Sequence, residues 1–281
     1  MAGFVREIAA VRHQRHAWVF TYRQRGSGLT NVSRVAITLK RFVASRFACV
    51  QERSLIAVIV PAHNEEELIG ACLGSLRTAA RCSGLLGETV VLIVVLDACT
   101  DGTETIARHE GARTVAVDAR NVGKARALGA DLALELGARW LAFTDADTVV
   151  EPSWLSTQIA LGNDAVCGTV AVRDWGAYGE RMRRHYEGTY TDADGHRHIH
   201  GANLGVSAEA YRRAGGFPAL ASSEDVALVE ALQRCGASIG WSAAPRVFTS
   251  TRRVFRAPSG FGATLLRIEV ESARSAPEGG A

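Results

Sequence analysis

Long hydrophobic runs are missing from this sequence of 281 residues. The longest uninterrupted apolar run covers residues 90–96, far short of the roughly 18 residues that a membrane-spanning helix needs. The amino terminus also lacks the apolar core of a signal peptide. With 47% hydrophobic and 22% charged residues, the composition is typical of a globular domain. We therefore expect a soluble protein located in the cytoplasm.

Two further absences exclude particular kinds of binding site. The six cysteines are scattered, and no CxxC pair occurs, so neither a zinc site nor a disulfide framework is expected. No GxxxxGK[ST] segment is present, which excludes a P-loop. Any nucleotide site must therefore use other elements.

Acidic residues are scarce in the first 54 residues, where ten Lys and Arg face two acids. The rest of the chain holds 22 against 27, so the net charge of +3 combines +8 with −5. Basic blocks of this kind attract anionic surfaces. We interpret residues 1–54 as a basic extension that is loosely ordered or makes peripheral membrane contact, and we expect no nucleic-acid partner.

From residue 55 onward, short β-branched runs alternate with amphipathic helical stretches. We expect five of these runs to be strands, at 56–60, 90–96, 113–117, 140–144 and 165–172. In the first intervening helix, Asn64 and Glu67 are spaced like a capping box, and the next two helices end at Gly111 and Gly137. The alternation predicts an α/β fold, a single Rossmann-like domain with a mainly parallel mixed sheet flanked by helices. We place it at 55–255, with halves 55–150 and 151–255, followed by a C-terminal tail at 256–281.

Polar segments follow three of these strands. They are PAHNEE at 61–66, DACTDGT at 97–103 and DADT at 145–148. Ligands of open parallel sheets bind at the carboxyl ends of the strands. We therefore expect these three segments to line one cleft.

The tetrapeptide TDAD occurs at 144–147 and again at 191–194. In the first copy, Asp145 and Asp147 follow a buried-strand pattern, and their carboxylates suit Mg²⁺ or Mn²⁺ bound to a phosphate. The second copy ends in Asp194-Gly195, a turn signal that suggests a hairpin. We therefore predict that the first copy is the metal site and the second a turn.

Three histidines follow the second copy at alternating positions, at 196, 198 and 200. We interpret them as one face of a polar edge strand rather than a metal site, because no carboxylate or thiol is spaced to complete such a site.

Five motifs, in order, resemble those of the family 2 glycosyltransferases of GT-A fold. They are the opening VIVPAHNEE-like segment, LDACTDGT, N-x-G-K-x-x-A, a DxD and a late ED at a helix start, found here at 59–66, 96–103, 121–127, 145–147 and 224–225. The resemblance covers about residues 55–250.

The resemblance implies a glycosyltransferase of the hexosyltransferase class that moves a sugar from a nucleoside diphosphate sugar to an acceptor hydroxyl. It implies that Asp225 is the general base of an inverting reaction and that Asp147 holds Mg²⁺ or Mn²⁺. The implied donor-nucleotide residues are Pro61, Ala62, Asn64, Glu65, Asp97, Gly123, Lys124 and Asp145, with Asp97 on the base and Asp145 near the ribose. On the acceptor side it suggests Glu224, His200 and Asn203.

Each of these residues also has a plainer role. Asp97 can bond the backbone of its own turn, Lys124 can be a solvated lysine, and Asp225 can stabilise a helix dipole. The QxxRW motif of processive synthases is absent, which favours transfer of one sugar. A retaining mechanism, a sugar-1-phosphate nucleotidyltransferase and a non-catalytic nucleotide-sugar binding protein remain alternatives, although the acidic first loop differs from the Gly-rich basic loop of nucleotidyltransferases.

Overall fold

The structure, a computed structural model, describes residues 8–13, 17–22, 54–252, 261–262, 265–266 and 268–269. The chain divides into two compact units, residues 1–51 and 52–281. In the first unit, strands β1 (Ile8–His13) and β2 (Ala17–Tyr22) pair antiparallel. These strands were not anticipated, and the remainder of the basic extension lies outside the described residues.

The second unit alternates strands and helices. Its strands are β3 (Leu55–Ala62), β4 (Thr89–Asp97), β5 (Arg113–Val117), β6 (Ala138–Phe143), β7 (Thr148–Val150), β8 (Ala165–Val172), β9 (Leu204–Ser207) and β10 (Ile239–Thr249). Its α-helices are α1 (Ile69–Ala79), α2 (Thr103–His109), α3 (Val122–Glu135), α4 (Trp154–Ala160), α5 (Gly179–Thr189), α6 (Ala208–Ala214) and α7 (Glu224–Arg234). Short 3₁₀ helices cover Ser83–Leu85, Gly176–Tyr178 and Gly201–Asn203.

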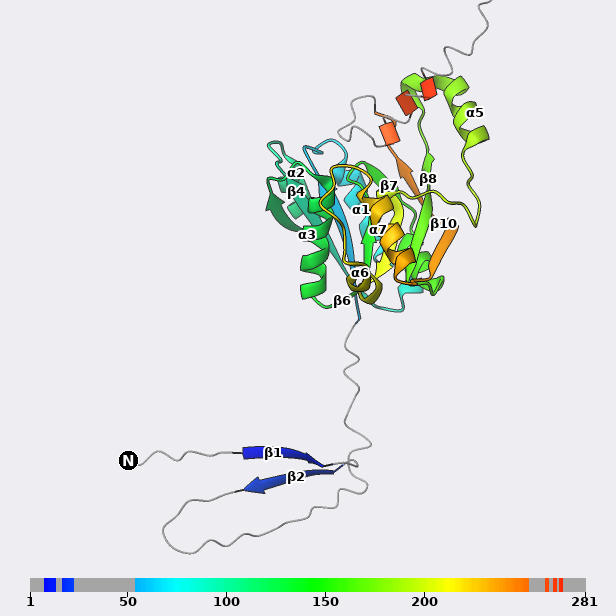
Figure 1. Ribbon diagram of the computed structural model, residues 1–281. Coiled ribbons are helices and arrows are strands. Elements are labelled where there is room, and N and C mark those ends of the chain that lie inside the picture. The colour runs from blue at the N-terminus through cyan, green and yellow to red at the C-terminus, as the bar shows by residue number, and fades with distance from the viewer. Residues whose placement is uncertain are drawn as a thin grey trace, which may run out of the picture. The chain divides into compact units, whose positions relative to one another are not determined.

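All eight of these strands form one sheet in the order β5-β4-β3-β6-β9-β8-β10-β7. The pairs β4-β5, β3-β4, β3-β6 and β8-β10 are parallel, whereas β9 runs antiparallel to both β6 and β8, and β7 runs antiparallel to β10. The helices lie on both sides of the sheet (Figure 1). The expected α/β domain with a mainly parallel mixed sheet is confirmed, and the five expected strands form within two residues of their expected ends.

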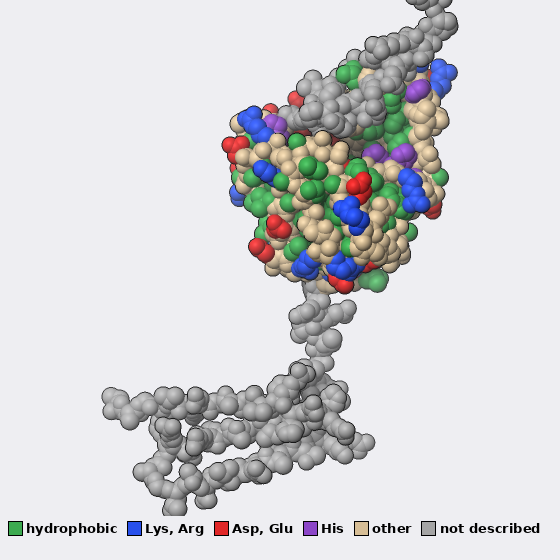
Figure 2. Space-filling model, viewed as in Figure 1, with side chains coloured by type: hydrophobic (Ala, Val, Ile, Leu, Met, Phe, Trp, Pro, Cys, Tyr) green, Lys and Arg blue, Asp and Glu red, His purple; other side chains and the backbone are tan. Residues whose placement is uncertain are grey.

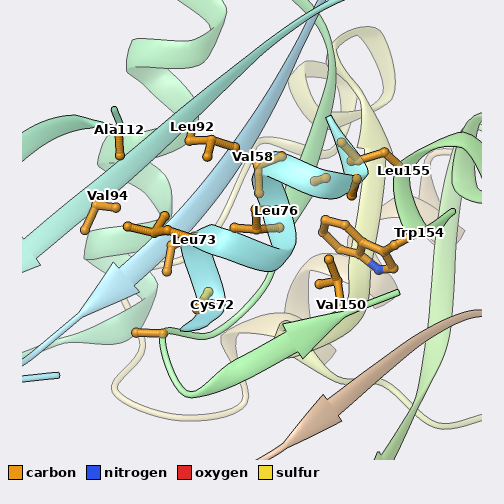
Figure 3. Packing of buried hydrophobic residues seen from close by; sticks show 14 of the residues in the cluster. Val58, Cys72, Leu73, Leu76, Leu92, Val94, Ala112, Val150, Trp154 and Leu155 are labelled. Atoms are coloured by element: carbon orange, nitrogen blue, oxygen red, sulfur yellow. The ribbon is translucent and has the colours of Figure 1, made fainter. Parts of the chain in front are cut away.

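Alternate residues of each central strand point to opposite faces, which produces two cores. On one face, Val58 and Val94 pack with Leu73 and Leu76 of α1 and with Trp154 of α4 (Figure 3). On the other, helices α3, α6 and α7 cover the sheet through a second cluster. Since both faces are buried, the central strands are nearly continuous apolar runs.

The first helix does not start with the expected capping box. Helix α1 begins at Ile69 without a side-chain cap, and Asn64 has a left-handed φ of 55°. Its side chain instead accepts a hydrogen bond from the backbone N–H of Thr100 at 2.7 Å. A bond to the neighbouring strand-end loop has replaced the local cap. The expected helix ends hold, since Gly111 and Gly137 have φ near +80°.

Among the described residues, no helix is long and apolar enough to cross a bilayer.

Candidate functional site

The sheet brings five separate segments to one edge. The parallel strands β3, β4 and β6 end there, at Ala62, Asp97 and Phe143. Because β9 is antiparallel and pairs Leu204 with Phe143, the segment that precedes it, including His200, reaches the same edge. Strand β10 is parallel to β8 and pairs Thr249 with Val172, so the residues after Thr249 arrive there as well.

Asn64 lies in the loop after β3, Asp97 is the last residue of β4 and Lys124 lies in the first turn of α3. The side chain of Asp97 is directed at the protein itself. Its carboxylate, 5% exposed, accepts hydrogen bonds from the backbone N–H groups of Ala119, Arg120 and Asn121 at 2.7–2.8 Å. The plainer role of Asp97, holding the loop before α3, is therefore present. Oδ2 accepts one of these three bonds and keeps acceptor capacity.

The start of α3 explains the Asn and Gly of the third motif. The side chain of Asn121 caps the helix by accepting from the N–H of Lys124 at 2.9 Å. A Cβ on Gly123 would lie 2.5 Å from the carbonyl oxygen of Pro218 and 2.7 Å from that of Leu220. Gly123 thus lets the loop before α7 pass directly against α3. The side chain of Lys124 is exposed.

Two arginines hold the carboxylates of this edge. Arg252, just beyond β10, forms two hydrogen bonds to Glu65 at 2.5 and 2.7 Å and lies 3.2 Å from the carboxylate of Asp147. It therefore joins the first motif to the DxD. Burial alone would lower the pKa of Arg252, but its bonds to Glu65 and the charge of Asp147 raise it.

The second arginine, Arg126 of α3, is 4% exposed. Its guanidinium pairs with Asp145 at 2.5 Å and with Glu224 at the start of α7. Glu224 is itself 3% exposed, and burial raises its pKa while Arg126 opposes that effect. Arg126 thus connects the DxD segment to the helix that carries the ED motif.

Asp225 differs sharply from its neighbour Glu224. Its side chain is partly exposed, and its carboxylate accepts from the backbone N–H of Gly201 at 2.7 Å and of Val226 at 2.9 Å. No arginine or lysine pairs with it among the described residues. Of the two carboxylates in the ED motif, Asp225 is therefore the one that solvent or a substrate can reach.

Gly201 is confined between these two groups. A Cβ there would come within 2.5 Å of the guanidinium atoms of Arg126, while the N–H of the same residue binds Asp225. Only glycine fits at this position.

The surroundings of Asp147 suit a divalent cation. Burial first, and then the charges of Asp145 and Glu65, raise the pKa of Asp147 to about 6 in spite of the opposing charge of Arg252. Three carboxylates thus repel one another around this position, and carboxylate oxygens are the ligands that Mg²⁺ and Mn²⁺ prefer. Within the described part of the chain, no group of three or more ligating side chains is arranged to enclose an ion. The site fits an ion that takes one or two protein carboxylates and completes its shell with phosphate and water, as Mg²⁺ commonly does.

The segment before β9 forms no strand, so the expected hairpin with a polar edge strand is wrong. The Asp194-Gly195 turn does occur, with Gly195 at φ +82°. The histidine rings stack at centroid distances of 5.5 and 5.9 Å, and Tyr190 stacks on His198 at 4.1 Å. Stacking has replaced strand pairing in ordering these side chains. Figure 2 shows histidine side chains, in purple, at several places on one face of the molecule.

His200 has a fixed partner. The hydroxyl of Tyr190 accepts from the N–H of Val170 at 2.9 Å and lies 3.0 Å from Nε2 of His200. The hydroxyl has one proton and two lone pairs, so the direction of this hydrogen bond is set by the tautomer of His200. Burial and the nearby His198 lower the pKa of His200 to about 4.

Asn203 does not face the cleft, contrary to the acceptor-side expectation. It is 0% exposed, donates to the carbonyls of Thr169 and Pro245, and accepts from Nε1 of Trp154. Its amide fills the interior where the register of β10 against β8 shifts between Ser242 and Val247. Both of its N–H donors are thus used within the protein, and its burial keeps Oδ1 away from any ligand.

The second TDAD stabilises the part of β10 in which the register against β8 shifts. Asp194 accepts from the hydroxyl of Ser242 and from the N–H of Ala243 at 2.8 and 2.9 Å, and Asp192 pairs with Arg246 at 2.7 Å. Both aspartates hold the irregular part of β10. Of the two copies, the first stands among the carboxylates at the strand ends.

The profile of Glycosyl transferase family 2 matches residues 57–215, which is more than half of the chain. The chain belongs to glycosyl transferase family 2.

Solved structures with the same fold agree with this assignment. Staphylococcus aureus TarS in complex with UDP-GlcNAc has 18% identity and a TM-score of 0.54, with 79% of this chain and 67% of that one covered. The mannosyltransferase PcManGT from Pyrobaculum calidifontis, in complex with GDP-Man and Mn²⁺, has 19% identity and a TM-score of 0.52 over 79% and 65%. Glucosyl-3-phosphoglycerate synthase from Mycobacterium tuberculosis, with Mn²⁺, UDP and its product, has 20% identity and a TM-score of 0.51 over 82% and 83%.

Against a longer TarS structure, the match covers 40% of that chain. The comparison with curated proteins found no match.

The motifs did not indicate two functional candidates of this family 2 glycosyltransferase. Arg126 stands at one of the x positions of the third motif, N-x-G-K-x-x-A. Arg252 follows a strand that was not expected, because Ala243, Ala244 and Pro245 interrupt the β pattern of β10. The sequence feature that Arg126 and Arg252 share is an arginine close to a helix start or a strand end that borders the carboxylates of this edge.

One hollow among the described residues lies away from this edge. It has a volume of about 250 Å³ and lies at the amino-terminal ends of β4 and β5, lined by Arg77, Arg81 and Arg113 among others. A smaller one of about 150 Å³ lies beside the functional edge, against Ala98, Cys99 and Asp101. Only the second adjoins the donor-side loops.

Proposed function

We propose that this protein is a metal-dependent glycosyltransferase that moves a sugar from a nucleoside diphosphate sugar to an acceptor hydroxyl with inversion. The observation that carries the proposal is the contrast within the ED motif. Glu224 is buried and neutralised by Arg126, whereas Asp225 is accessible and has no cationic partner in the described part of the chain. An accessible, unneutralised carboxylate is what general-base catalysis requires.

The donor is assigned to the loops after β3, β4 and β6. Pro61, Ala62, Asn64 and Glu65 line the nucleoside side in this proposal, and a base N–H would use the acceptor capacity left on Oδ2 of Asp97. Gly123 and Lys124 stand beside the diphosphate, and Asp145 beside the ribose. Structures of the same fold with UDP-GlcNAc or GDP-Man support a nucleotide sugar as donor.

Asp147 is the proposed metal ligand. When bound, Mg²⁺ or Mn²⁺ neutralises charge on the departing diphosphate. The chain's own contributions are then to hold the donor between the first loop and the DxD, and to take a proton from the acceptor hydroxyl at the carboxylate of Asp225. The two backbone N–H bonds to that carboxylate fix its orientation.

His200 is the acceptor-side residue that the geometry retains. It is neutral and partly exposed, and it adjoins Gly201, whose N–H binds Asp225. Glu224 acts through position rather than by contact in this proposal, because its carboxylate is enclosed with Arg126.

Substitution of Asp225 by Asn tests the base. The amide keeps the size of the side chain and its bond to Gly201 but cannot take a proton, so turnover to acceptor should fall by about 10²–10⁴-fold. Donor affinity, measured by calorimetry, should stay within a few-fold. Asp194→Asn is the matched control and should keep full turnover. Normal turnover in Asp225→Asn would remove the inverting mechanism and favour a retaining one.

Product analysis separates the proposal from its rival among the nucleotidyltransferases. Release of a nucleoside diphosphate supports sugar transfer, and release of pyrophosphate supports nucleotidyl transfer. The acidic first loop, in which Glu65 is already committed to Arg252, provides no basic cradle for a triphosphate.

A further inference from the structure

The position of Arg252 suggests a function that no motif indicates. Its guanidinium lies between two carboxylates from different strand ends, Glu65 after β3 and Asp147 after β6. The side chains of Glu65 and Asp147 are 7% and 17% exposed, and that of Arg252 is 24% exposed. A positive charge of the chain itself therefore sits on the same carboxylate that is proposed to hold the metal.

The charges around this position are unbalanced. Glu65, Asp145, Asp147 and Glu224 supply four negative charges, and Arg126 and Arg252 supply two positive ones. Without Arg252 the excess would be three negative charges. A divalent cation and this guanidinium thus neutralise the same excess of negative charge. The guanidinium lies 3.2 Å from the carboxylate of Asp147, so it occupies space that an ion bound to that carboxylate would need.

Arg252 can change partners within this edge. It lies three residues beyond the end of β10 at Thr249, outside the hydrogen-bonded ladder of the sheet. Its guanidinium presents a planar pair of donors that binds phosphate as well as it binds carboxylate. An incoming diphosphate offers it new acceptors within the same cleft.

We propose that Arg252 is a built-in counter-cation that keeps divalent metal off Asp147 until a nucleoside diphosphate arrives. In the ligand-free protein the guanidinium neutralises Glu65 and Asp147. When the donor binds, the guanidinium moves to diphosphate oxygens, and Asp147 becomes available to the ion. Metal and nucleotide then bind cooperatively, and metal alone binds weakly. This inference rests on the proposed function for the identity of the donor.

The test measures Mn²⁺ binding directly, from the signal of free Mn²⁺ in electron paramagnetic resonance. The full-length protein is titrated with Mn²⁺ alone, and then in the presence of UDP or of GDP. In the wild type, the nucleotide that binds should increase Mn²⁺ affinity by about tenfold or more, within the roughly 5–150-fold range of coupled sites.

Two variants identify the cause. Arg252→Ala should bind Mn²⁺ alone about tenfold more tightly than the wild type, with a smaller further gain from nucleotide. Arg252→Gln, which keeps more of the side chain, should behave in the same direction and serves if the alanine variant does not fold. The matched control is Arg246→Ala, which removes another arginine of β10 that pairs with an aspartate at 2.7 Å and should leave Mn²⁺ binding unchanged.

Equal Mn²⁺ affinity in the wild type and both Arg252 variants would overturn the proposal. Equal tightening in Arg246→Ala would overturn it too, because net charge alone would then explain the effect. Failure of the proposed function looks different, since neither nucleotide then binds the wild type with or without Mn²⁺ and no sugar is transferred. If nucleotide binds and Mn²⁺ affinity is independent of it, only the counter-cation role fails.

Discussion

Replacement of Arg126 by methionine should strongly destabilise the domain. The side chain is 4% exposed and pairs with both Asp145 and Glu224. Removing one partner of a buried ion pair typically costs about 3–5 kcal/mol, because the other charge is left buried without compensation. Asp145, whose side chain is 38% exposed, can regain water, but Glu224 at 3% exposure cannot.

A second effect reduces this cost. The Nε atom of Arg126 is buried and has no hydrogen-bond partner, and an unsatisfied buried donor costs about 1–3 kcal/mol. Methionine removes that donor. We therefore expect a net loss of about 2–4 kcal/mol in the free energy of unfolding for Arg126→Met.

The double variant Arg126→Met/Glu224→Gln tests this reasoning. It removes both charges of the buried pair, so its loss in the free energy of unfolding should be smaller than the sum of the losses of the two single variants by about 2 kcal/mol or more. Urea unfolding followed by tryptophan fluorescence measures all four proteins. Arg139→Met is the control, since Arg139 pairs with Glu88 at 2.5 Å but is 41% exposed, and surface pairs contribute about 0–1 kcal/mol. Additive losses in the double variant, or a loss from Arg126→Met no larger than that from Arg139→Met, would refute the account.

Three further predictions address the metal, the N-terminal unit and pH. Asp147→Asn should abolish metal-dependent nucleotide binding, whereas Asp194→Asn should keep it; calorimetry with Mn²⁺ and a nucleoside diphosphate decides, and equal losses would mean that the wrong TDAD was chosen. Deletion of residues 1–50 should leave donor affinity unchanged, because every proposed donor residue lies within 54–252, and a tenfold weaker affinity by the same calorimetry would contradict this. An unfolded histidine titrates near 6.5, above the value of about 4 in the folded protein, so His200 contributes stability above about pH 6.5 and loses it as the pH falls toward 4. Between pH 7 and 5 the wild type should therefore lose about 2 kcal/mol more than His200→Gln in urea unfolding, and equal losses would argue against a neutral His200.

The strand-end cleft could be predicted because local patterns determine it. Runs such as 90–96 are apolar on both faces, as strands buried between two helical layers must be, and the polar segments after them were therefore placed correctly. The start of α1 was not predictable in the same way. The side chain of Asn64 accepts a hydrogen bond from the backbone N–H of Thr100 instead of capping the helix, and this contact exists only in the folded sheet.

The arginines could not be predicted for a similar reason. A single buried arginine such as Arg126 looks like any surface arginine of a helix until the carboxylates that surround it are assembled from other segments. For Arg252, strand β10 had first to be recognised across Ala243, Ala244 and Pro245, where its pairing with β8 is irregular. Burial of Asn203 likewise depends on that irregularity, since its amide donates to the carbonyl of Pro245.

The second TDAD lies outside the strand-end site, yet it helps to determine which residue after β10 reaches the carboxylate of Asp147. Asp194 binds Ser242 and Ala243, at the start of the register shift of β10, and the strand then runs on to Thr249 before Arg252 appears. Side chains of a strand alternate between its faces, so one residue more or fewer in the irregular part would exchange inward and outward positions along the rest of it. Asp194 thus fixes the position at which the irregular part of β10 begins. A deletion or insertion of a single residue between Ala243 and Val247 would leave the DxD intact and yet present Asp147 with a different neighbour.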